Sequence, residues 1–274
     1  MPAPLHVPPP LMARLTSPAG PAIVRLVTRV DVSVLALPCR YSVTTLILAP
    51  SGVAIADLGS RTDVPLVLEA LAALGRSPSE VRCIVPTHLH FDHVMGIDAF
   101  ARRFGIPVAL GTVAHDHVTN GRPLRFPDGP RLWRAILTWP MQGLPFLAPE
   151  DIAQGRDFGT PWGRDAFRAE LAPPLRHGDP LPGFPGWTVL STPGHSDDSI
   201  CLHHAEAGFL VAGDTVRDFC GGEFNPLLVD PEAMERTKSF LRTLPVDTVF
   251  PGHGPVLEGS EVLYRIKTLP FFVP

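Results

Sequence analysis

The sequence predicts an α/β fold in which strand-like and helical segments alternate. Two patterns support this class. Short, β-branched apolar segments recur in both halves of the chain, and segments with helical apolar spacing stand between them. In addition, 45% of the 274 residues are hydrophobic, which is enough to build a large core. The length by itself allows one domain or two.

The first half begins with segments rich in β-branched residues. We expect strands at Ile23–Val34, Ser42–Leu48 and Val53–Asp57. Helical spacing predicts a helix at Val64–Leu74, which Gly75 would end.

Alternation then continues toward the middle of the chain. Val81–Val85 is expected to be a short buried strand, and Val94–Phe104 a second helix that ends at Gly105. Val108–Leu110 is expected to be another strand.

Residues 111–180 interrupt this alternation and are interpreted as an insertion, with helices at Arg131–Leu137 and Arg164–Leu171. An aromatic cover beside a reactive site would bind an apolar part of a substrate and exclude water. The alternative is that the rings form a satellite core or a homodimer contact. The aromatic residues concerned are Phe126, Trp133, Trp139, Phe146, Phe158, Trp162 and Phe167.

The second half repeats the order of elements. Strands are expected at Trp187–Leu190, Ser199–His203, Phe209–Ala212 and Thr248–Phe250. A helix is expected at Asp230–Leu244, with Asp230 as its N-cap and Pro231 in the first helical position.

Composition narrows the classes of function. The net charge of −4 gives no basic field that would favour nucleic acid. The four cysteines form no CxxC pair and fit a reducing cytoplasm. The Pro-rich residues 1–20 are expected to form an extended arm that is not a secretory signal, followed by a single domain at 21–274. The sequence contains no run of 18 apolar residues, so we predict no membrane span.

A histidine-rich segment follows the predicted strand Val81–Val85. It carries His88, His90, Asp92 and His93, and neutral imidazole and carboxylate are the usual ligands of zinc and similar divalent metals. Four such groups suit two metals better than one closed tetrahedron. The alternative is a solvated polar loop that holds three histidines by chance.

Three further ligand-type residues lie in glycine-containing turns directly after strand-like segments: His195, Asp214 and His253. The order HxHxDH, His, Asp, His resembles the metallo-β-lactamase superfamily of binuclear metal hydrolases, over about residues 22–256. This resemblance implies a four-layer αββα sandwich, with two sheets inside and helices outside.

The resemblance also implies a role for each ligand. His88, His90 and His195 would bind the first metal, Asp92, His93 and His253 the second, and Asp214 would bridge both. The metals would be two divalent ions, zinc, iron or manganese, sharing a nucleophilic hydroxide. Asp92 would pass a proton to the leaving group. Asp57 would support a metal-binding histidine, or would be a plain turn residue.

The residues within the motifs indicate the substrate class. The phrases HLHFDH and TPGHS look most like those of acyl-homoserine lactone lactonases, so a lactone is the predicted substrate of this small-molecule hydrolase. Thioesters, as in hydrolases resembling glyoxalase II, and phosphoesters are the alternatives. Those glyoxalases carry a C-terminal helical domain, which we do not expect after Pro255. Lactonases place a tyrosine where this chain has Arg217, which would stabilise an oxyanion, bind a carboxylate or phosphate, or be exposed.

Three other kinds of superfamily member are alternatives to such a hydrolase. Class B β-lactamases lack an aspartate at the position of Asp214 and are therefore disfavoured. Mononuclear iron sulfur dioxygenases use only the first set of ligands, and noncatalytic binding proteins usually lose ligands. Two metals per chain favour a hydrolase, and one iron per chain with oxygen uptake favours a dioxygenase.

Overall fold

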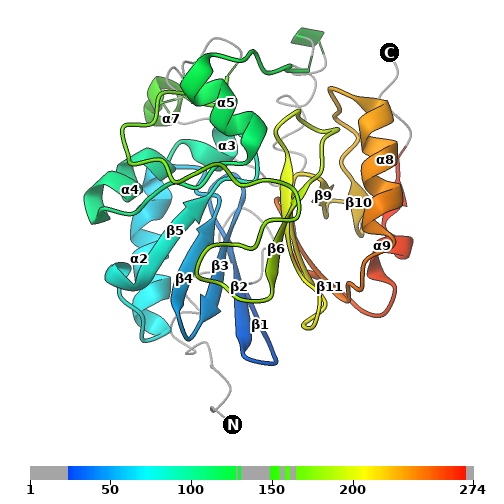
Figure 1. Cartoon of the computed structure of the whole chain (residues 1–274), viewed down its shortest axis with the longest axis horizontal. Helices are drawn as coiled ribbons and strands as arrows, with labels where there is room; N and C mark the ends of the chain where they lie inside the picture. The colour runs from blue at the N-terminus through cyan, green and yellow to red at the C-terminus, as the bar shows by residue number, and fades with distance from the viewer. Residues whose placement is uncertain (1–23, 128, 131–148, 155–157, 161–164, 270–274) are drawn as a thin grey trace.

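The computed structural model describes residues 24–127, 129–130, 149–154, 158–160 and 165–269. The predicted arm at 1–20 and the predicted helix at Arg131–Leu137 lie outside the described residues. Two five-stranded sheets pack against each other, and helices cover the outer face of each sheet (Figure 1). No helix among the described residues is long and apolar enough to cross a membrane.

The first sheet has the strand order β1-β2-β3-β4-β5. Its strands are β1 (Arg25–Arg29), β2 (Val32–Pro38), β3 (Val43–Ala49), β4 (Gly52–Ala56) and β5 (Val81–Val85). Neighbouring strands are antiparallel except β4 and β5, which are parallel. The single strand predicted at Ile23–Val34 is in fact two strands, because the chain turns at Val30, where φ is +53°.

Strand alternation in the first sheet serves two cores. Leu35 and Leu37 pack with the helices on the outer face, whereas Val34 and Ala36 pack in the core between the sheets. The outer helices are α2 (Val64–Ala73) and α4 (Ile97–Phe104), with short 3₁₀ turns η1 (Arg61–Asp63) and η2 (Pro78–Glu80). Helix α4 ends at Gly105, as predicted, in the left-handed conformation.

The second sheet has the order β12-β11-β8-β7-β6, in which β8 and β11 are parallel. Its strands are β6 (Trp187–Ser191), β7 (Ile200–His204), β8 (Phe209–Gly213), β11 (Thr248–Pro251) and β12 (Leu257–Glu258). Helices α8 (Pro231–Leu241) and α9 (Val262–Arg265) cover its outer face. As predicted, Asp230 caps α8 by accepting a hydrogen bond from Ala233 N at 2.9 Å. A small third sheet joins β9 (Val216–Arg217), β10 (Glu223–Phe224) and β13 (Lys267–Thr268).

Three apolar clusters hold these layers together. One lies between the first sheet and α2 and α4, one lies between the sheets, and one lies between the second sheet and α8 and α9. Trp187, Phe209 and Phe250 are large buried residues of the middle cluster. The predicted αββα order of layers is therefore confirmed.

The short helix α3 (Phe91–Val94) precedes α4, and the region between the two halves contains α5 (Thr112–Asn120) and α7 (Pro149–Gln154). The helix predicted at Arg164–Leu171 is wrong for its described residues, 165–171. These residues run beside Val108, whose N–H donates to Glu170 O at 2.8 Å, so backbone pairing prevails over helical spacing. Phe158 and Phe167 pack with the first core, so these two rings belong to a main core and not to a separate satellite core.

Candidate metal centre

The predicted ligands lie where strands of both sheets end. His88 and His90 follow β5, and α3 begins directly after His90. His195 follows β6, Asp214 follows β8, and His253 follows β11. Because the two sheets pack face to face, these strand ends bring residues from both halves of the chain to one place. The structure brings all seven predicted ligands together there.

The donor atoms of the first predicted set face one another. His90 Nδ1 lies 3.0 Å from His195 Nε2, and His195 Nε2 lies 3.5 Å from Asp214 Oδ2. Ligand atoms at about 2.0–2.1 Å from a tetrahedral zinc ion are about 3.3 Å apart, so these spacings fit a shared metal. His88, His90 and His195 form one group whose ligand atoms all lie within 4.8 Å of one another.

The second predicted set has similar spacings. His253 Nε2 lies 3.3 Å from Asp92 Oδ2 and 3.3 Å from Asp214 Oδ1, and His93 Nε2 lies 3.2 Å from Asp214 Oδ1. The two oxygens of Asp214 therefore face different ligand sets. This is the arrangement expected of a carboxylate that bridges two metals.

Buried lone pairs without partners favour occupation of this site by cations. His88 Nε2 is buried and makes no hydrogen bond with any described residue. A buried polar atom without a partner costs about 1–3 kcal/mol, whereas the lone pair of a neutral imidazole is a ready metal ligand. Burial lowers the pKa of His88 and His195, and lowers that of His90 to about 3, which keeps these three imidazoles neutral.

The second set has the opposite electrostatics. Burial opposes the charged form of His253, but the carboxylates of Asp214 and Asp92 raise its pKa to about 9. The pKa of His93 is also raised, against burial, by Asp214, Asp57 and Asp92. Protons on these two imidazoles thus balance buried carboxylates, and divalent cations bound here would take the place of those protons.

The comparison with known proteins identifies the family. Residues 37–253 match the family model for the metallo-beta-lactamase superfamily. The chain belongs to the metallo-β-lactamase superfamily. The match spans most of the chain and both ligand sets, so the family and fold expected from the motifs are confirmed.

Individual relatives support the same assignment. The chain is 27% identical over 213 residues to "Probable metallo-hydrolase YqjP" of Bacillus subtilis (strain 168), covering 71% of this chain and 61% of the relative. It is 28% identical over 198 residues to "Acyl-coenzyme A thioesterase MBLAC2" of Homo sapiens, covering 67% and 60%. The chain thus spans about three fifths of the length of these relatives.

The fold likeness extends to solved structures. The metallo-beta-lactamase family protein TTHA1429 of Thermus thermophilus matches with a TM-score of 0.59 at 24% identity. The match covers 86% of this chain and 76% of that one. At this identity the likeness supports the fold alone.

Hydrogen bonds orient the histidines of this superfamily member. Asp57 Oδ2 accepts from His93 Nδ1 at 2.9 Å and from Thr87 Oγ1 at 2.8 Å, and Asp57 Oδ1 accepts from Thr87 N at 2.7 Å. His195 Nδ1 donates to Leu227 O at 2.6 Å. Each bond fixes one ring nitrogen and turns Nε2 toward the ligand cluster. Asp57, although it has the positive φ of a turn residue (+62°), therefore also supports a predicted ligand.

Three supporting groups were not predicted from the sequence. Asp198 is buried and accepts a hydrogen bond from Leu89 N at 2.8 Å, between His88 and His90. Ser42 Oγ donates to Asp92 O at 2.6 Å, and Asn225 Nδ2 donates to Asp214 Oδ2 at 3.3 Å. The only signal for Asp198 in the sequence was its place near His195, and nothing in the sequence pointed to Ser42 or Asn225.

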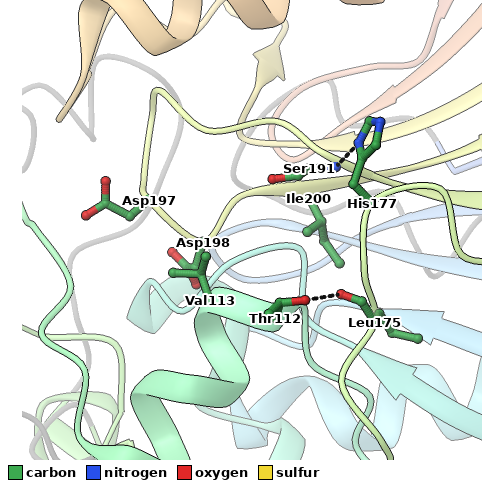
Figure 2. A pocket seen from close by; sticks show the side chains of 8 residues that line it. All are labelled: Thr112, Val113, Leu175, His177, Ser191, Asp197, Asp198 and Ile200. Atoms are coloured by element: carbon green, nitrogen blue, oxygen red, sulfur yellow. Dashed lines mark hydrogen bonds between the residues drawn. The ribbon is translucent and has the colours of Figure 1, made fainter.

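Asp198 also borders a cavity of about 190 Å³ (Figure 2). Burial raises the pKa of Asp198 to about 6. The other polar groups around the cavity are largely paired: Thr112 Oγ1 donates to Leu175 O at 3.0 Å, and His177 Nδ1 accepts from Ser191 N at 3.1 Å. None of the seven predicted ligands lines this cavity, so we do not interpret it as the reaction site.

Arg217 lies three residues beyond Asp214 but is paired with a different carboxylate. Its Nε is 3.2 Å from Glu223 Oε1, and its guanidinium lies 5.1 Å from the centre of the Phe219 ring. Glu223 is fully buried and also accepts from Phe219 N and Cys220 N. The side chain of Arg217 is only 15% exposed, so the alternative of an exposed residue is wrong.

Two phenyl rings flank the ligand cluster. The ring centre of Phe126 lies 5.6 Å from that of His90, and the ring centre of Phe219 lies 5.6 Å from that of His253. Each ring thus packs on a ligand of a different set. Apolar groups at these positions limit the access of water to the site.

Proposed function

We propose that this member of the superfamily is a binuclear metallohydrolase that cleaves an acyl thioester. The observation that carries the proposal is Asp214, whose two carboxylate oxygens face two different sets of ligands at 3.2–3.5 Å. Zinc is the metal we propose, with iron or manganese as substitutes, because histidine and carboxylate suit all three. A small-molecule substrate with an apolar portion is the proposed partner.

The surroundings of the site favour an acyl substrate over a phosphoester. Arg217 is the arginine nearest in sequence to Asp214, but its charge is balanced by the buried Glu223. A phosphate would therefore gain little from it, whereas a neutral carbonyl with an apolar chain fits beside Phe126 and Phe219. The relative MBLAC2, by its name an acyl-coenzyme A thioesterase, supports a thioester as the first candidate.

The residues of the chain would divide the chemistry among them. When bound, the metals would supply Lewis acidity and lower the pKa of water to about 7. Asp214 would hold both ligand sets at a fixed separation, and Asp57 and the Leu227 carbonyl would hold His93 and His195 in the orientation required for binding. Asp92 Oδ2, which lies 3.3 Å from His253 Nε2, would hold the proton that the leaving sulfur needs.

Turnover of defined substrates tests this proposal. Protein loaded with zinc, iron or manganese would be assayed against acyl thioesters, lactones, aryl esters and phosphoesters, and its metal content measured. We expect two metals per chain and the highest kcat/KM on thioesters. A stoichiometry below one, or turnover of phosphoesters alone, would refute the proposal. One iron per chain with oxygen uptake would favour a sulfur dioxygenase.

A lactone is the second candidate. It is favoured by the phrases His88–His93 and Thr192–Ser196, which resemble those of acyl-homoserine lactone lactonases. Ring opening of a lactone and cleavage of a thioester both proceed through attack on an acyl carbonyl, so the same residues would serve both. The ratio of kcat/KM for a thioester and a lactone of equal chain length distinguishes them.

A further inference from the structure

We propose that Phe126 is the wall of an acyl-chain site beside the metal centre, and that Arg125 positions it. The inference rests on the proposed hydrolysis of an acyl ester or thioester and names the part of the site that would recognise the acyl chain. Phe126 is partly exposed, and its ring is tilted by 33° to the ring of His90 at 5.6 Å. A long acyl chain whose carbonyl lies at the ligand cluster would reach this ring.

The segment that carries Phe126 extends from the end of α5 to the second half of the molecule. Leu124 packs against the first core, on the side of α2 and α4. Phe126 belongs to none of the three apolar clusters formed by the described residues. Its main described ring contact is thus a predicted metal ligand, which is unusual for a residue whose purpose is only to fill a core.

Arg125 attaches this segment to the other half of the molecule. Its Nε donates to both carboxylate oxygens of Asp197 at 3.0 Å, and its Nη2 donates to Asp230 Oδ2 at 3.1 Å. The backbone N of Arg125 also donates to Asp197 Oδ2 at 3.1 Å. Asp197 lies two residues after His195, and Asp230 caps α8, so both anchors are fixed by the second half.

The hydrogen bonds of Arg125 are better explained by a role in positioning Phe126 than by a contribution to the stability of the fold. The side chain of Arg125 is 57% exposed, and exposed ion pairs contribute little to the free energy of unfolding. A forked guanidinium that grips a carboxylate fixes geometry instead. The neighbouring residue in the chain, Phe126, is thereby held against His90.

The ligand class follows from the chemistry of the wall. A phenyl ring offers apolar surface and no hydrogen bond, so it would recognise the hydrocarbon chain of the acyl group. Each methylene buried against it should raise kcat/KM about fourfold until the chain outgrows the wall. An acetyl group, which is too short to reach the ring, should be indifferent to it.

The test compares Phe126→Ala and Arg125→Ala with wild type on saturated acyl thioesters and aryl esters from acetyl to decanoyl. We expect Phe126→Ala to lower kcat/KM for octanoyl substrates, mainly through KM, by at least tenfold more than it lowers kcat/KM for acetyl substrates. Arg125→Ala should also reduce the increase of kcat/KM with acyl-chain length, because Phe126 would no longer be held against His90. Arg25→Ala is the matched control, because Arg25 grips Glu258 in a similar exposed pair remote from the site.

Binding of product-like acids separates this inference from the proposed function. Calorimetry with octanoate and acetate on the metal-loaded protein should show tighter octanoate binding that Phe126→Ala abolishes. If the wild type binds octanoate in this way but hydrolyses no ester, the proposed function fails and the acyl site stands. If Phe126→Ala lowers turnover of all chain lengths equally, reduces metal content, or leaves octanoate binding unchanged, the inference is wrong.

Discussion

Replacement of Asp57 by asparagine tests how the metal centre is supported. The carboxylate of Asp57 accepts three hydrogen bonds, from Thr87 N, Thr87 Oγ1 and His93 Nδ1, at 2.7–2.9 Å. Asparagine has the same size and tolerates the positive φ of +62° at this position, so the backbone should be retained. If the amide oxygen of asparagine keeps the bond to Thr87 N, the amide nitrogen faces Thr87 Oγ1 and His93 Nδ1. Because the amide nitrogen is itself a donor, it cannot accept hydrogen bonds from these two groups.

The magnitude follows from the bonds that are lost. A hydrogen bond to a charged group contributes about 1.5–3 kcal/mol. Loss of such support typically lowers metal affinity about 10- to 100-fold, which corresponds to about 1.4–2.7 kcal/mol. Because the side chain of Asp57 bonds to His93 and to no other predicted ligand among the described residues, the metal that we propose for Asp92, His93 and His253 should be the one that is bound more weakly.

The assay is competition with a chromophoric chelator at constant pH, which resolves the two dissociation constants. Asp98→Asn is the matched control, because Asp98 is also buried and accepts backbone hydrogen bonds, from Arg168 N and Ala169 N, outside the site. We expect it to lower stability without changing metal affinity. If Asp57→Asn binds both metals as tightly as wild type does, Asp57 is a turn residue and our account of its role is wrong.

Three further predictions follow from the same structure. Asp214→Ala should lose one metal or bind it weakly and should lower turnover by orders of magnitude, whereas Arg217→Ala should keep both metals. Elemental analysis and kinetics would measure both effects. Two metals and near-normal turnover in Asp214→Ala would exclude a bridging role for Asp214. Removal of metal by a strong chelator should lower the melting temperature, because the ligands come from both halves, and an unchanged melting temperature after verified removal would contradict this. Burial raises the pKa of Asp63 to about 6, so its neutral form is favoured in the fold and its destabilising effect grows as the pH rises from about 4 to 6. Asp63→Asn should therefore be more stable than wild type at pH 7.5, by up to about 3 kcal/mol, but not at pH 4. Chemical denaturation at the two pH values measures this, and an equal difference in the free energy of unfolding at both would refute it.

The sequence was informative where local pattern and order of motifs decide the structure. Apolar segments predicted most strands, and Gly105 and Asp230 marked helix ends that the structure confirms. The pairing of Val108 with Leu171 was not predictable, because it joins residues far apart in the chain and overrides helical spacing. The same reason explains why Asp198, whose partner Leu89 is 109 residues away, was missed.

Partnerships of charged groups were the hardest to foresee. The position of Arg217, three residues after Asp214, suggested a role toward substrate, but sequence spacing says nothing about a competing carboxylate. Glu223 lies on the neighbouring strand β10, directly opposite Arg217 in the antiparallel pair, and is fully buried. A cation stabilises a buried carboxylate, and the register of β9 and β10 places Arg217 beside Glu223.

The electrostatics of the ligand cluster explain why a rigid scaffold of two sheets suits this chemistry. Without metals, the carboxylates of Asp92 and Asp214 raise the pKa of His93 and of His253, so protons on these two imidazoles offset the two carboxylates among the seven predicted ligands. Exchange of those two protons for the two divalent cations that we propose would make the same cluster positive, while its donor atoms stay anchored to strand ends in both halves. A positive, buried cluster attracts an anionic nucleophile and stabilises the negative charge that develops on an attacked carbonyl. The fold thus fixes the positions of the ligands, and the proposed exchange of protons for cations would make the cluster electrophilic.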